Sequence, residues 1–212
     1  MSDSCFLNII GEPCAHLLNL IQQAGMQSIT DAPNMETDGY ILLEAPKEDD
    51  HLLKREHKKG KPILGIGSGA KWLVETGIIP GIEGDKSVVQ IKTLQEVVRQ
   101  SVHLVPSIGF QYNAFTRFLS PQTIWVLDAL PIYSYFSIPP MLLAEMIENG
   151  LVIFKDEELG YPLIIANKAG NAMAAIQPIY LAKNGLDIFK SIQAYIKKGY
   201  KQRVVPLHYY PR

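Results

Sequence analysis

A strand that runs through a glycine-rich turn directly into a helix constrains this 212-residue chain more than any other segment. It spans residues 61–73, K-P-I-L-G-I-G-S-G-A-K-W-L, with an apolar run before the glycines and a helical pattern after them. Such a junction exposes a nucleophile in α/β hydrolytic folds, and the helix N-terminus that follows can bind an anion. The segment therefore predicts an α/β fold with its site at this turn.

The spacing within the turn excludes three familiar motifs. A phosphate loop needs a lysine followed by serine or threonine, and that pair is absent. Gly65, Gly67 and Gly69 alternate, whereas a dinucleotide-binding turn has the spacing G-x-G-x-x-G. A nucleophilic serine in G-x-S-x-G needs a glycine two residues to either side, where Ser68 has isoleucine and alanine.

Strand and helix patterns alternate on both sides of the turn. Apolar runs predict strands at 6–10, 38–43, 62–66 and 172–176, and helical spacing predicts helices at 14–24, 48–59, 70–75 and about 185–199. Short β-rich runs between 87 and 137 predict an antiparallel extension, and 151–154 with 161–166 predict a hairpin. We therefore expect one domain over 1–212, an α/β three-layer sandwich with a mostly parallel central sheet plus antiparallel strands from the middle of the chain.

Charge and composition exclude several partners and locations. Basic and acidic residues number 20 and 21, which gives no electrostatic basis for binding nucleic acid or an anionic membrane. The longest stretch without acidic, basic or histidine residues, 129–144, is too short to span a bilayer. The first residues lack the pattern of a secretory signal, and Cys5 and Cys14 are too few for a disulfide framework or a zinc site. We expect a cytoplasmic protein with no metal or other cofactor.

The glycine-rich turn resembles the elbow of class I glutamine amidotransferases, P-x-L-G-I-C-x-G-x-Q-L-L, in residues 62–73. Other fragments resemble, in the same order, the glutaminase subunit of imidazole glycerol phosphate synthase, which belongs to histidine biosynthesis. They are 38–43 (D-G-I-I-L-P in that family), 77–81 (G-L-I-P-G), 105–111 (V-P-H-M-G-W-N), 132–135 (V-H-S-Y) and 175–181 (V-Q-F-H-P-E). The resemblance covers nearly the whole chain and implies a flavodoxin-like sandwich.

The residues that perform glutamine hydrolysis in that family are replaced here. The family uses a cysteine nucleophile, a histidine base and a glutamate that orients the histidine. The resemblance places these roles on Gly67, Ile179 and Leu181, none of which can supply the chemistry. Glu44 stands where the oxyanion strand has a glycine, and its carboxylate would repel a developing oxyanion. Gly67 would hold the strained conformation of the elbow at the least cost.

The same resemblance implies which residues would contact a ligand, and Ser68 offers a substitute nucleophile. The implied ligand-binding residues are Gly65, Ser68, Gly69, Lys71, Tyr133 and Ser134. A serine nucleophile needs a base within hydrogen-bond reach. Of the five histidines, we expect only His16 and His208 to be able to approach the pocket. The simpler expectation is that Ser68 caps the helix that follows it.

Three functions remain open at this point. The leading one is a catalytically inactive glutaminase-like protein that binds a synthase-type barrel subunit or another protein, and the missing groups count against glutamine binding. The second is a functioning glutaminase or amidotransferase subunit that uses displaced residues such as Ser68. The third is a small-ligand binding domain that holds a carboxylate or phosphate at the helix N-terminus, assisted by Lys71.

Overall fold

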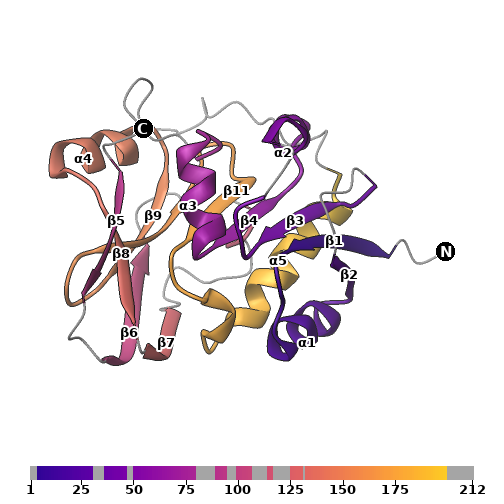
Figure 1. Ribbon diagram of the computed structural model, residues 1–212, viewed down its shortest axis with the longest axis horizontal. Helices are drawn as coiled ribbons and strands as arrows, with labels where there is room; N and C mark the ends of the chain where they lie inside the picture. The colour runs from indigo at the N-terminus through magenta and orange to yellow at the C-terminus, as the bar shows by residue number, and fades with distance from the viewer. Residues whose placement is uncertain are drawn as a thin grey trace, which may run out of the picture.

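The computed structural model describes residues 4–30, 36–46, 50–79, 89–94, 99–106, 114–116, 125–130 and 132–199 (Figure 1). Residues 107–111 of the fragment 105–111 lie outside these residues, as do Pro80, Gly81 and His208. Within the described part of the chain, no helix has the length and apolar character needed to cross a membrane.

A large twisted sheet forms the centre of the molecule, with nine strands among the described residues. Its spatial order is β2-β1-β3-β4-β11-β10-β9-β6-β7. The first five are mutually parallel, and the remaining pairs are antiparallel. Only β10 and β6 therefore oppose the common direction of these described strands. The strands are β1 Cys5–Ile10, β2 Met26–Thr30, β3 Gly39–Leu42, β4 Ile63–Ile66, β6 Arg99–Pro106, β7 Trp125–Leu130, β9 Val152–Asp156, β10 Pro162–Ala166 and β11 Ala172–Ala175.

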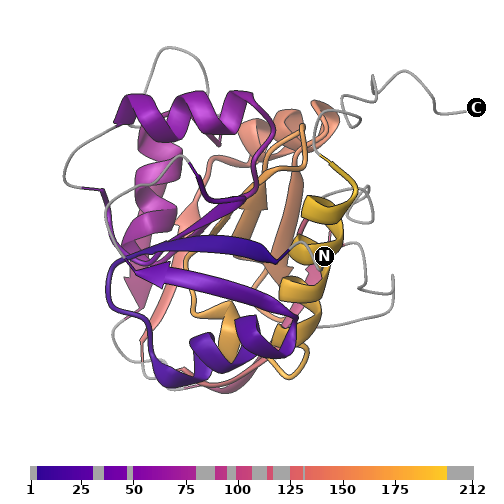
Figure 2. The same cartoon turned by 90° about the vertical axis from the view of Figure 1, so that its right-hand side faces the viewer.

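Helices cover both faces of this sheet and complete three layers (Figures 1 and 2). On one face, α1 (Ala15–Gln23) and α5 (Gly185–Lys197) bury their apolar stripes in one core cluster. On the other face, α2 (Asp50–Lys58), α3 (Ser68–Glu75) and α4 (Pro140–Glu148) contribute to a second cluster. The predicted α/β three-layer sandwich with a mostly parallel sheet is confirmed.

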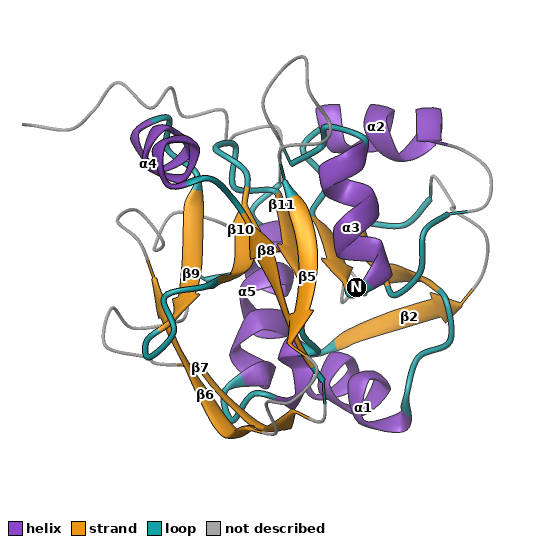
Figure 3. Ribbon diagram, turned by 60° about the vertical axis from the view of Figure 1, so that its left-hand side comes forward, coloured by secondary structure: helices purple, strands orange, loops and turns teal. Residues whose placement is uncertain are grey.

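A small antiparallel sheet of β5 (Gln90–Leu94) and β8 (Tyr133–Ser137) lies beside α3 (Figure 3). Together with the antiparallel pair β6 and β7, it confirms the predicted antiparallel extension from the middle of the chain. The predicted hairpin is also confirmed, as β9 and β10. One strand and one α-helix of the described residues were not predicted: β2, which forms one edge of the described sheet, and α4, which begins at the second of two prolines.

Candidate functional site

The turn between β4 and α3 has the backbone of a nucleophile elbow, with glycine at its centre. Gly67 has φ 59° and ψ −116°, a combination that residues with a Cβ adopt only under strain. Its N–H donates to the Ala175 carbonyl at 3.0 Å, which ties the turn to the end of β11. A Cβ built on Gly67 would meet no atom within 4 Å. The position has room for a side chain and carries none.

Gly65 and Gly69 serve close packing between strand and helix. A Cβ on Gly65 would lie 2.6 Å from the Gly69 carbonyl oxygen, and a Cβ on Gly69 would overlap the Leu42 carbonyl. Both glycines are buried, and neither lines the pocket beside the elbow. Gly65 therefore lies on β4 under α3, and Gly69 lies in the first turn of α3, where the two glycines let the helix approach β3 and β4 closely.

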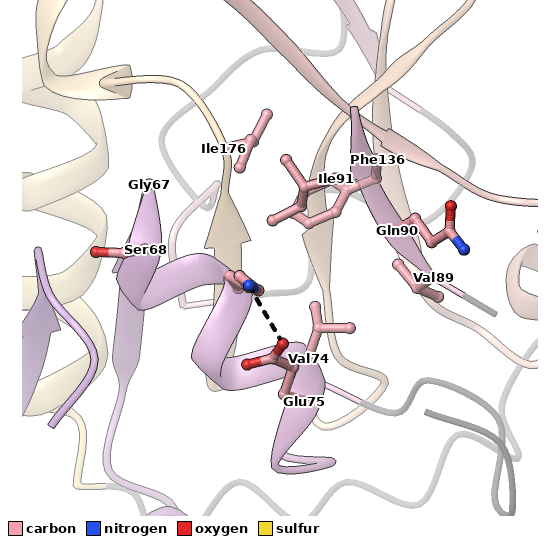
Figure 4. Close-up of a pocket in the computed structure, with 10 residues that line it drawn as sticks. Gly67, Ser68, Val74, Glu75, Val89, Gln90, Ile91, Phe136 and Ile176 are labelled. Atoms are coloured by element: carbon pink, nitrogen blue, oxygen red, sulfur yellow. Dashed lines mark ion pairs between the residues drawn. The ribbon is translucent and has the colours of Figure 1, made fainter. Parts of the chain in front are cut away.

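Ser68 faces away from the pocket although its backbone borders it. Its side chain points away from the other lining side chains in Figure 4, and its hydroxyl donates to the Leu43 carbonyl at 3.1 Å, after β3. The prediction that Ser68 caps the helix is wrong, because Gly67 is the N-cap and α3 has no side-chain cap hydrogen bond. Ser68 is instead the first helical residue, and its hydroxyl joins the elbow to the neighbouring strand end.

The two positions assigned to the base and its orienting carboxylate do not line the pocket beside the elbow. Ile179 and Leu181 lie in the 3₁₀ helix η2 (Ile179–Leu181). Ile179 is fully buried in the core cluster that contains α1 and α5, whereas Leu181 is 46% exposed. Neither lines the pocket. The residue of this segment that does is Ile176, directly after β11.

Sequence reasoning missed Ile176 because its proximity to Gly67 depends on long-range strand pairing. Ala175 pairs with Ile66 in the parallel ladder of β11 and β4, so the next residue of each strand reaches the same edge. Only a prediction of the register between these two strands would have placed Ile176 beside Gly67. No local motif marks it.

The backbone N–H groups that follow β3 already donate hydrogen bonds within the main chain. The N–H groups of Leu43 and Glu44 both donate to the Ile10 carbonyl, at 2.9 and 3.3 Å. An oxyanion hole needs donors aimed at a developing negative charge. These two donors point to a main-chain oxygen instead, and the Glu44 side chain is exposed.

Tyr133 and Ser134 belong to the β8 strand, and neither lines the pocket. Tyr133 is fully buried and its hydroxyl donates to Asp156 Oδ2 at 2.6 Å. The Ser134 hydroxyl lies 2.9 Å from the Thr93 hydroxyl on β5, and its carbonyl accepts a hydrogen bond from Gln177. In this structure both residues connect elements to each other.

The pocket beside the elbow has a volume of about 590 Å³ and lies between α3 and the small sheet (Figure 4). Lys71 and Glu75 provide its charged groups among the described residues, and their Nζ and Oε1 atoms are 3.6 Å apart. Its described lining comprises Gly67, Ser68, Lys71, Val74, Glu75, Val89, Gln90, Ile91, Phe136 and Ile176. Of the predicted ligand-binding residues, the structure brings Ser68 and Lys71 to this pocket.

The described histidines lie elsewhere. His16 Nε2 is 3.1 Å from the Tyr180 carbonyl, His57 Nε2 is 3.0 Å from the Asn167 amide nitrogen, and His103 Nδ1 is 3.7 Å from Glu157. His51 is exposed on α2. Burial lowers the pKa of His57 below its ordinary value. None of these four lines the elbow pocket, and His208 is outside the described residues.

Comparisons with known proteins concern the fold. No protein-family model matches the sequence. Among solved structures, PurLQS from Thermotoga maritima is similar with a TM-score of 0.58 at 13% identity, covering 91% of this chain and 99% of that chain. The glutaminase domain of Trypanosoma brucei CTPS with bound acivicin gives 0.55 at 10% identity, covering 92% and 94%. A glutamine amidotransferase from Methylobacillus flagellatus gives 0.52 at 12% identity, covering 98% and 99%. The chain thus has the fold of glutamine amidotransferase structures.

Proposed function

We propose that this chain is a glutamine amidotransferase-like protein that does not hydrolyse glutamine and acts by binding a partner protein. Within that group we assign it to the type of the imidazole glycerol phosphate synthase glutaminase subunit. The observation that carries the proposal is the elbow itself. Its strained backbone is retained, while Gly67 leaves the nucleophile position without a reactive atom.

The absence of a base does not depend on how the family motif is aligned. Residues 172–181 contain no histidine, acidic residue or basic residue. If the motif His-Pro-Glu is moved so that its proline falls on Pro178, the base position becomes Gln177. That side chain is buried, and its amide donates to the carbonyls of Ile132 and Ser134. A neutral amide cannot accept the proton of a nucleophile, so both alignments support the proposal.

A displaced nucleophile receives little support from the geometry. The Ser68 hydroxyl is engaged by Leu43, and no described histidine lines its pocket. The main-chain donors of Leu43 and Glu44 are occupied by Ile10, which removes them as oxyanion donors. Nucleophile, base and oxyanion stabilisation are three separate contributions to acyl transfer. Among the described residues at this pocket, each of the three is missing or takes part in another hydrogen bond.

A protein partner suits the exposed apolar side chains near this edge of the sheet. Leu181 is 46% exposed and Ile132 is 63% exposed, on segments that Gln177 joins through its hydrogen bond to the Ile132 carbonyl. Large apolar side chains on a surface favour a protein contact where they form a continuous patch, and the proposal places Leu181 and Ile132 in one such patch. We propose a synthase-type barrel subunit as the partner.

The test of inactivity is a glutaminase assay with and without a purified synthase-type barrel. We expect glutamate release at the level of the buffer control in both arms. Release well above that level would overturn the proposed inactivity. If Ser68→Ala then abolished the release, a displaced serine nucleophile would be the explanation. Because the exposed Cys14 can react with a thiol alkylator, labelling with a glutamine-mimicking inhibitor must be followed by mapping the adduct by mass.

The test of partner binding is a titration of the barrel against the full chain. We expect Leu181→Glu to weaken the complex and Met141→Glu, at a more exposed apolar position on α4, to leave it unchanged. Equal effects of the two variants, or no complex at all, would overturn this partner assignment.

A further inference from the structure

The elbow pocket combines one apolar wall with one pair of opposite charges. Val74, Ile91, Phe136 and Ile176 supply apolar surface from α3, β5, β8 and the end of β11 (Figure 4). The charges are the Lys71 ammonium and the Glu75 carboxylate, on successive turns of α3. A pocket with this lining selects for a ligand that carries both charges next to an apolar group.

The neutral polar side chains of the lining are directed elsewhere. Ser68 donates its hydroxyl hydrogen to the Leu43 carbonyl, on the side of the helix away from the pocket. The amide of Gln90 points away from α3 in Figure 4. Among the described lining residues, Lys71 and Glu75 are thus the groups that can fix a ligand's polar end.

The ion pair is open to exchange with a ligand. Its Nζ–Oε1 distance is 3.6 Å, and the two side chains are 59% and 54% exposed. Exposed pairs of this kind contribute little to stability, because water competes for both charges. A ligand carboxylate can therefore approach Lys71, and a ligand ammonium can approach Glu75, with little loss to the protein.

We propose that the elbow pocket binds a free apolar α-amino acid, with its carboxylate on Lys71, its ammonium on Glu75 and its side chain against Ile91, Phe136 and Ile176. The inference rests on the proposed function, because a pocket that does not hydrolyse glutamine has no requirement to bind glutamine. A glutamine side chain would place an amide against the apolar wall without partners, which costs binding energy. An apolar side chain of similar length gains from the same surface.

The test is a titration of the full chain by NMR with L-leucine, L-glutamine, 4-methylpentanoate and 3-methylbutylamine. The last two ligands keep the leucine skeleton but lack the ammonium and the carboxylate, respectively. We expect L-leucine to bind about tenfold more tightly than each of the others. Lys71→Met and Glu75→Gln should each weaken L-leucine binding about fivefold or more. Both positions are exposed, so the variants should remain folded, which circular dichroism verifies.

The matched control is Lys190→Met, which breaks another exposed ion pair, Lys190–Asp187 at 3.6 Å on α5, outside the pocket. We expect it to leave L-leucine binding unchanged. Equal binding of glutamine and leucine, no saturable leucine binding, or an equal loss in Lys190→Met and Lys71→Met would each overturn the proposal. Glutamate release in the separate glutaminase assay would overturn the proposed function and leave this titration valid. Failure of the titration would leave the proposed inactivity intact.

Discussion

Gly67 has a backbone conformation that is strained for other residues, although the space around it has room for a side chain. Its φ of 59° and ψ of −116° lie in a region that costs a residue with a Cβ about 1–3 kcal/mol. Its surroundings impose no steric limit within 4 Å. A substitution at this residue therefore reports backbone strain with little contribution from packing.

We predict that Gly67→Ala lowers the free energy of unfolding by about 1–3 kcal/mol, the cost of that backbone conformation. Urea denaturation of both proteins measures the difference. Gly69→Ala is the comparison, because its Cβ would overlap the Leu42 carbonyl and its loss should be larger. A Gly67→Ala variant as stable as the parent would contradict the elbow geometry.

Glu56 is a buried carboxylate held in its charged form by two lysines. Lys59 and Lys61 lie 2.7 and 2.8 Å from its two oxygens. Burial alone would raise the pKa of Glu56, but the hydrogen bonds and charges of these lysines outweigh it and lower the pKa to about 2. A carboxyl whose pKa is lower in the folded state stabilises the fold above its unfolded value.

We predict that this contribution, roughly 3 kcal/mol, is complete above about pH 4.5 and is lost as the pH falls towards 2. Denaturation curves of the parent and Glu56→Gln across this range measure it. The difference between the two proteins should shrink with falling pH. A difference independent of pH would show that the carboxylate is not the titrating group.

At the scale of elements, His57 and two asparagines join the end of α2 to the turn between β10 and β11. Asn171 donates its amide to the carbonyls of His57 and Lys61, and Asn167 receives the N–H groups of Asn171 and Ala172. Burial lowers the pKa of His57, so the fold favours its neutral form. Protonation therefore destabilises this junction.

We predict that stability falls as the pH drops through the ordinary histidine value of about 6.5, because the unfolded chain binds this proton more readily. The free energy of unfolding between pH 7.5 and 5.5 measures the effect, and His57→Gln should reduce the slope. His51→Gln, at an exposed position of the same helix, is the control and should retain it. Identical slopes in all three proteins would exclude His57 as the cause.

The hydroxyl of Tyr133 joins β8 to the last residue of β9, Asp156. Asp156 accepts it and also accepts the N–H groups of Glu158 and Leu159. We predict that Tyr133→Phe lowers the free energy of unfolding by about 1–3 kcal/mol, because a buried carboxylate loses a partner. Urea denaturation measures it. Titration with L-leucine should give the same affinity in both proteins. A loss of binding without a loss of stability would show that Tyr133 contributes to ligand binding.

The elements with strong local patterns could be predicted from the sequence, and those defined by distant contacts could not. Helical spacing and a glycine stop mark α5, and its observed end agrees with Gly199 at φ 69°. β2 is a half-exposed edge strand whose five residues show no continuous apolar run. The elbow at Gly67 was predictable because its glycine spacing is local. The position of Ile176 and the burial of Ile179 depend on the pairing of β11 with β4.

At the scale of the whole molecule, the two core clusters lie on opposite faces of shared strands. β4, β10 and β11 supply residues to both clusters, so neither can lose its packing while the other is kept. We predict one thermal unfolding transition with a calorimetric enthalpy close to the van't Hoff enthalpy. Scanning calorimetry measures both. Two resolved transitions would contradict the single domain expected over 1–212.

The last described strand along the chain, β11, lies in the interior of the sheet between β4 and β10. Roughly a hundred residues separate it from β4, which corresponds to about 5–20 s of synthesis on a ribosome at ordinary rates. During that interval β4 has no partner on one side, and an open strand edge can pair with other chains. The fold therefore creates a period during translation in which a nascent chain needs protection from aggregation. A chain that ends before Ala172 lacks β11, so its β4 edge would stay unpaired and the need for protection would persist.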